Sequence, residues 1–138
     1  MPVFKDPKRL AAHIKKALDF QVADTIASTQ AGLGSASISP VQDGRLRSSW
    51  FASEGAGTGA VAPEGANSPN TDAANLRVDS RKTYTLQNAL PYAQRVALEG
   101  HVSSRKPIPV TWFRDFRDQV IPKIQAEAAR QAKREFDL

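Results

Sequence analysis

Ser39-Pro-Val-Gln-Asp-Gly-Arg-Leu-Arg-Ser-Ser-Trp50 is typical of a loop that turns sharply before a short helix and a strand. Pro40 fixes its own φ and favours extended backbone at the residue before it. Asp43 and Gly44 are a turn signal, because Asp bonds forward to backbone amides and Gly adopts positive φ without strain. The loop is therefore expected to reverse direction at these two residues.

Residues 45–49 predict one helical turn after the reversal, with Leu46 facing the core. Arg45 and Arg47 face outward in this arrangement, and two interpretations stay open for them. Either both are simply solvated, or both contact another molecule. Trp50 then begins a strand that covers roughly residues 49–53.

A second motif, Gln87-Asn-Ala-Leu-Pro-Tyr-Ala-Gln-Arg-Val-Ala-Leu-Glu-Gly100, follows later in the chain. The residues before it, 82–88, alternate and are rich in Thr and Tyr, which predicts a strand. Pro91 is expected to open a short helix that runs to Glu99. Tyr92 is expected to be a buried anchor with a bonded hydroxyl.

Together the two motifs resemble the small neck and tail-completion proteins of tailed bacteriophages, the family that includes the minor tail protein Z group. That family usually has Thr/Ser-Pro-Val-Asp-Thr-Gly-Arg-aliphatic-Arg-x-x-Trp and then Asn-x-Leu-Pro-Tyr-Ala-x-x-aliphatic-Glu. The chain departs at Gln42-Asp43, where Asp-Thr is usual, and at His101, where the family often continues with Gly, an aromatic and Ser. The resemblance spans about residues 8–125, and neither motif is catalytic. The structural positions that it carries over are Pro40, Asp43, Gly44, Trp50, Asn88, Pro91 and Tyr92.

The resemblance implies a virion structural protein that acts in the neck, at the head–tail junction, after assembly in the cytoplasm of a bacterial host. Copies would close into a homo-oligomeric ring, with six favoured over twelve. The ring would connect portal or adaptor ring proteins to tail tube or tail terminator proteins, with non-specific contact to the passing DNA. The expected interface or DNA-channel residues are Arg45, Arg47, Arg105 and Lys106, together with an arm over residues 55–70.

A long helix is expected at the N-terminus, from near Pro7 to near Ala31. Asp6 is a suitable N-cap before a proline at the first helical position. Gly32 and Gly34 are expected to end the helix. Apolar residues recur every four positions and predict a packing face: Leu10, Ile14, Leu18, Val22 and Ile26.

The C-terminal region has the strongest helical periodicity of the chain. Pro122 lies inside it and removes one helical hydrogen bond, so a kink is expected at that point. The end of the helix, residues 128–138, has little apolar surface of its own and is expected to project from the domain. Its apolar stripe is Trp112, Phe116, Val120, Ile124 and Ala128.

The middle of the chain, residues 54–81, is rich in small and turn-forming residues and predicts a flexible loop or arm. Its glycines do not complete a phosphate-binding motif, because no Gly-Lys-Ser/Thr is present. The overall prediction is one α+β domain over residues 1–138. It has a small antiparallel β-sheet packed with a long N-terminal helix and a kinked C-terminal helix.

Composition narrows the possible functions. The net charge of +5 is concentrated at the ends, with +3 in residues 1–20 and +3 in residues 101–138. The alternative function is therefore a stand-alone nucleic-acid-binding module that uses the basic terminal helices.

The chain has no cysteine, no expected signal peptide and no apolar run long enough to span a membrane. Its two histidines, His13 and His101, fit no metal or catalytic spacing, so no enzyme activity, metal or cofactor is expected.

Overall fold

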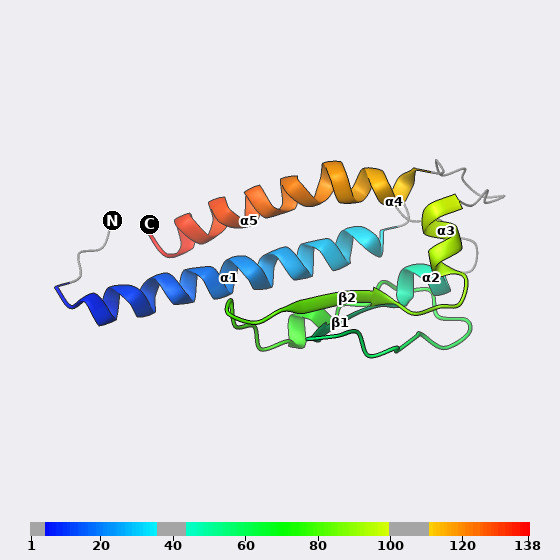
Figure 1. Cartoon of the computed structure of the whole chain (residues 1–138), viewed down its shortest axis with the longest axis horizontal. Helices are drawn as coiled ribbons and strands as arrows, with labels where there is room; N and C mark the ends of the chain where they lie inside the picture. The colour runs from blue at the N-terminus through cyan, green and yellow to red at the C-terminus, as the bar shows by residue number, and fades with distance from the viewer. Residues whose placement is uncertain (1–4, 36–43, 100–110) are drawn as a thin grey trace.

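The computed structural model describes residues 5–35, 44–99 and 111–138 and has an α+β fold, as predicted. Figure 1 shows the long N-terminal helix lying between the C-terminal helix on one side and a two-stranded sheet on the other. The elements follow in the order α1 (Pro7–Leu33), α2 (Arg45–Ser48), β1 (Trp50–Glu54), η1 (Asp72–Asn75), β2 (Tyr84–Asn88), α3 (Ala93–Glu99), α4 (Trp112–Asp115), η2 (Phe116–Val120) and α5 (Ile121–Glu135).

Helix α1 begins as predicted, because the Asp6 carboxylate accepts a 2.9 Å hydrogen bond from the backbone amide of Lys8. It ends two residues later than predicted. Gly32 lies inside the helix, where an added Cβ would come within 2.7 Å of the Phe116 ring. Gly34 is the C-cap, and its amide donates to the carbonyl of Gln30 at 3.0 Å. The absence of a side chain at Gly32 therefore leaves room for the Phe116 ring to pack against α1.

The apolar stripe of α1 is buried less than predicted. Ile14 and Leu18 keep 40% and 46% of their surface exposed. A spacing of four residues drifts by about 40° per step around an α-helix, so a stripe built on it winds away from one face. Ala17, one position from Leu18, is buried instead. The prediction of a continuous packing face is wrong for this part of the helix.

The sheet consists of β1 and β2, paired antiparallel as predicted, with Trp50 opposite Asn88 and Glu54 opposite Tyr84. The main core lies at the C-terminal end of α1, where α2, α3 and α4 gather (Figure 1). Apolar side chains from both helical and strand segments fill it. Its buried members are Leu33, Leu46, Trp50, Leu90, Ala93, Val96, Trp112 and Phe116.

The C-terminal helix is interrupted just before Pro122, by the π-helical segment η2. The wider π turn precedes a proline in the first turn of α5, where the missing N–H of Pro122 is not required. The sequence predicts a kink at Pro122, and the structure has the π-helical segment Phe116–Val120 shortly before this proline.

The end of α5 packs along α1 and does not project from the domain. Ala128 and Ala132 are only 1% and 3% exposed. The Phe136 ring meets the rings of His13 and Phe20 edge-on, each with 5.7 Å between centroids. This corrects the expectation for residues 128–138, because small alanines let the two helices approach closely.

Candidate interaction surface

The two sequence motifs meet at Asn88. Its side-chain amide donates a 2.7 Å hydrogen bond to the carbonyl of Leu46, in α2. Its side-chain oxygen accepts from the amide of Leu90 at 3.3 Å. Because Asn88 is also the ladder partner of Trp50, one residue joins α2, the sheet and the turn before α3.

Gly44 provides the turn that precedes α2, with φ of 87°. A Cβ at this position would lie 1.9 Å from the side-chain oxygen of Asn67, so only glycine fits. The Gly44 carbonyl accepts from the amide of Ser48 at 3.2 Å and from its hydroxyl at 2.8 Å. The turn prediction is confirmed at Gly44, while Pro40 and Asp43 lie outside the described residues.

Trp50 is an aromatic anchor, 8% exposed, whose ring stacks on Phe113 with 6.1 Å between centroids and an interplanar angle of 6°. Phe113 in turn meets Trp112 edge-on. The indole N–H of Trp112 donates to the carbonyl of Val96 at 3.0 Å. The tryptophan of the first motif thus joins β1 to the C-terminal helix.

The second motif turns into α3 at Leu90, which is buried. The helix begins at Ala93, two residues after Pro91, and the Ala93 amide donates to the Leu90 carbonyl at 3.0 Å. Pro91 is exposed, and Tyr92 is half-buried against the core. Tyr92 is therefore less buried than predicted.

Arg45 and Arg47 are half-buried and bind the central loop of the same chain, residues 55–70. Arg45 donates from Nε to the carbonyl of Ala62 at 2.9 Å. Arg47 donates from Nη2 to the side-chain oxygen of Asn67 at 2.9 Å and also to its carbonyl. Neither guanidinium is simply solvated. The interpretation of Arg45 and Arg47 as solvated side chains is therefore wrong.

The central loop is held against α2 and the sheet. Ala62 is buried, and its amide donates to the fully buried hydroxyl of Ser49 at 3.1 Å. Gly59 donates its amide to the side-chain oxygen of Gln87 at 2.9 Å. Residues 55–70 therefore already have partners within the chain, unlike an arm that a partner must order.

An open hollow of about 350 Å³ lies between this loop and the start of the sheet. The described residues that line it carry no charge and include two asparagines and two serines. The lining residues are Ser48, Phe51, Ala62, Pro63, Ala66, Asn67, Ser68 and Asn70.

Gln30, 2% exposed, centres a buried polar network that the sequence did not reveal. Its Nε2 donates to the carbonyl of Trp50 at 3.0 Å and to Asp72 Oδ1 at 2.5 Å. Its Oε1 accepts from the amide of Ala73 at 3.0 Å. Asp72 Oδ1 also accepts from the amide of Ala52 at 3.1 Å. The network fixes η1 to both α1 and β1.

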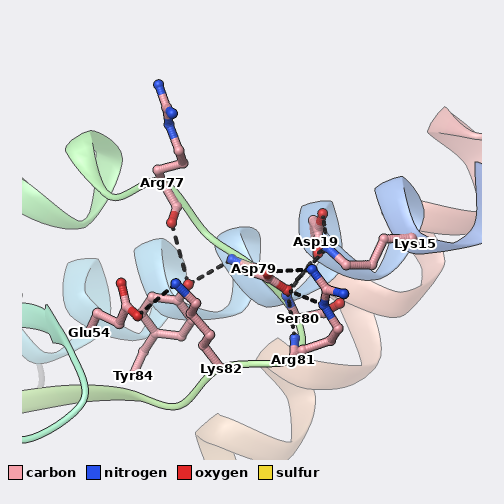
Figure 2. Close-up of polar contacts among 9 residues, drawn as sticks. All are labelled: Lys15, Asp19, Glu54, Arg77, Asp79, Ser80, Arg81, Lys82 and Tyr84. Carbon is pink, nitrogen blue, oxygen red and sulfur yellow. Dashed lines mark hydrogen bonds and ion pairs between the residues drawn. The ribbon is translucent and has the colours of Figure 1, made fainter. Parts of the chain in front are cut away.

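A charged cluster fastens the segment before β2 to the N-terminal half of α1 (Figure 2). Lys15 Nζ lies 2.7 Å from Asp19 Oδ2 and 3.1 Å from Asp79 Oδ1. Asp19 also accepts from the amide of Ser80 at 2.7 Å. Hydrogen bonds from Lys15 lower the pKa of Asp19, and those from Arg81 hold the pKa of Asp79 well below its usual range.

Arg105 and Lys106 lie outside the described residues, so their predicted role has no structural counterpart here.

Among residues 5–35, 44–99 and 111–138, no three potential metal-ligating side chains come together. None of the helices in this part of the chain combines the length and the apolar character needed to cross a membrane. His13 Nε2 lies 2.6 Å from the Phe136 carbonyl, at the contact between the two long helices.

Comparison with protein-family models, curated proteins and solved structures found no match to this chain.

Proposed function

We propose that the chain is a ring-forming neck or tail-completion subunit of a tailed bacteriophage, which connects the head portal assembly to the tail and surrounds the DNA passage. The observation that supports this most is the meeting of the two motifs through Asn88 and Leu46. Among the described residues on which the resemblance rests, Trp50 and Asn88 pair across the sheet, and Tyr92 packs against the core that contains Trp50.

The mechanism in this proposal is surface complementarity, without turnover or a cofactor. Contacts between different faces of neighbouring copies close a ring, and six copies are favoured over twelve. One face of the ring would meet portal or adaptor ring proteins, and the other would meet tail tube or tail terminator proteins. DNA would pass through the ring with non-specific contacts only.

The contact surface in this proposal is the central loop together with α2. Arg45 and Arg47 donate hydrogen bonds to Ala62 and Asn67 and so hold the loop in place. The loop is then presented to a neighbouring copy in one conformation. A prearranged loop binds with a smaller loss of conformational entropy than a mobile one. Arg105 and Lys106 add basic charge, which suits either a neighbouring subunit or the DNA channel.

Complementation tests this assignment. Particles that lack the chain are supplied with a variant carrying Arg45→Glu and Arg47→Glu, and joined heads and tails are counted by electron microscopy. We expect joining to be lost, because both acids repel the carbonyls that the arginines bind. A control with Arg114→Glu and Arg130→Glu changes the charge equally on exposed positions of the C-terminal helix. Normal joining by the Arg45 and Arg47 variant would exclude this contact surface.

The alternative, a stand-alone nucleic-acid-binding module, has no specific observation in its favour among the described residues. Part of the C-terminal basic charge is paired with acids, since Arg117 contacts Asp118 at 2.8 Å and Arg130 contacts Glu127. Tight DNA binding that falls steeply with salt would nevertheless support this alternative over the ring.

A further inference from the structure

The hydrogen-bond phase of the sheet determines which backbone groups of β2 face outward. The Gly55 amide donates to the Thr83 carbonyl at 2.8 Å, so this pair lies in the hydrogen-bonded position. Such pairs alternate along an antiparallel ladder. With the observed register, Thr85 and Gln87 bond to β1. The N–H and C=O groups of Tyr84, Leu86 and Asn88 therefore point away from β1.

The opposite edge of the sheet is closed. On β1 the outward amide of Ala52 donates to Asp72 Oδ1 at 3.1 Å. The outward carbonyl of Trp50 accepts from Gln30 at 3.0 Å. These bonds confirm the phase assigned above, and they leave little room for another strand beside β1.

Among the described residues, no strand lies beside the outer edge of β2. In the part of the chain that the structure describes, the outward N–H and C=O groups of Leu86 have no hydrogen-bond partner. Proteins usually protect such edges with charged residues or proline. Tyr84-Thr-Leu-Gln-Asn88 contains neither. This strand is thus suited to accept another strand through its backbone.

We propose that β2 pairs with β2 of a second copy of this chain, antiparallel about a two-fold axis at Leu86. Each Leu86 would then face its equivalent, and Tyr84 would face Asn88 of the other copy. A second copy fits because its β1 edge is closed, which leaves its own β2 as the available edge. The paired strands carry no charge, so no like charges meet across the axis.

The pairing would create a four-stranded sheet with the order β1, β2, β2, β1. Sheets of three or more strands are more stable than a two-stranded one, which gives the association a physical reason. The contact is the same surface on both copies and closes at two. The inference concerns the isolated protein. In a ring that contacts different partners on its two faces, neighbouring copies are not related by a two-fold axis, so this dimer would separate before the proposed ring closes.

Analytical ultracentrifugation of the whole chain tests the proposal together with the Leu86→Pro variant. Proline is tolerated on an edge strand where its N–H would face solvent, so the fold should persist while the central bonds of the dimer are lost. We expect wild-type dimers, and a dimer dissociation constant raised by roughly tenfold or more in the variant. A monomeric wild-type protein, or a dimer unaffected by Leu86→Pro, would overturn the proposal.

A cysteine crosslink gives a second measurement that does not require the proline variant to fold. The chain has no cysteine, so Leu86→Cys introduces a unique thiol. Opposed residues in a hydrogen-bonded pair have Cα atoms about 5.5 Å apart, within the range of a disulfide. We expect mild oxidation to link two Leu86→Cys chains, whereas Ala126→Cys, at an exposed position of α5, stays unlinked. Equal crosslinking of both variants would refute the two-fold pairing.

Discussion

The side-chain amide of Asn88 donates a 2.7 Å hydrogen bond to the backbone carbonyl of Leu46, across 42 positions of the sequence. This bond joins the end of β2 to α2, so the two motifs stabilise each other. The Asn88 carboxamide is partly buried, and its loss would leave the Leu46 carbonyl without this donor. The relationship makes Asn88 a structural residue whose removal has a measurable cost.

Asn88→Ala is expected to lower the free energy of unfolding by about 1–2 kcal/mol, because a partly buried carbonyl loses this hydrogen bond. Chemical denaturation measures the difference. Gln87→Ala is the matched control, since the Gln87 side chain bonds to the exposed amide of Gly59. A larger loss for Gln87→Ala than for Asn88→Ala would contradict the structural role of Asn88.

Gly44→Ala should destabilise the protein more than Gly55→Ala, although both glycines have positive φ. The strain of a left-handed backbone costs roughly 1–2 kcal/mol in either variant. At Gly44 the new Cβ also collides with Asn67, whereas nothing lies within 4 Å of a Cβ at Gly55. Thermal unfolding of the two variants gives the comparison, and equal effects would argue against the packed turn.

Gln30→Ala is expected to cost about 3 kcal/mol, because it leaves buried polar groups of Trp50 and Ala73 without their partners. Hydrogen exchange should also rise at the Ala73 amide. Gln21→Ala provides a control on the same helix, at a half-buried position. If Gln30→Ala matched this control, the network would be less important than its geometry indicates.

Acid should weaken the attachment of the segment 79–81 to α1. The pKa values of Asp19 and Asp79 are lowered in the folded protein, so their contribution is full above the unfolded value of about 4. The contribution is lost as the pH falls below that value, because protonation removes the ion pairs with Lys15 and Arg81.

The melting temperature measured at falling pH tests this prediction. The Asp79→Asn variant should lose less stability on acidification than the wild type, since one of the two carboxylates is already neutral. As a control, Asp24→Asn makes the same change of charge on α1, outside this charged cluster. An identical acid response in the wild type and in Asp79→Asn would disprove the contribution of the cluster.

Local signals in the sequence were sufficient for most element positions. Asp6 before Pro7 predicts the start of α1, because the cap and the helix lie within one turn of each other. Gly44 likewise predicts the turn before α2, because the positive φ that the turn needs is a property of this single residue. The stripe through Ile14 and Leu18 was misleading, since periodicity identifies an apolar face without saying which neighbours cover it.

Contacts between distant residues could not be predicted from local chemistry. The bonds of Arg45 to Ala62 and of Gln30 to Asp72 depend on how the central loop returns to the sheet. The composition of that loop indicated flexibility, because small residues allow many conformations. In the fold the same small residues let the loop approach Ser49 and the sheet closely, as at the buried Ala62.

Cryo-electron microscopy of intact phage particles that carry this chain tests the central claim most directly. The account predicts a closed ring of this chain at the head–tail junction, with DNA passing through its centre and the central loop at a contact with a neighbour. Complete particles in which the junction contains no copy of the chain would contradict it.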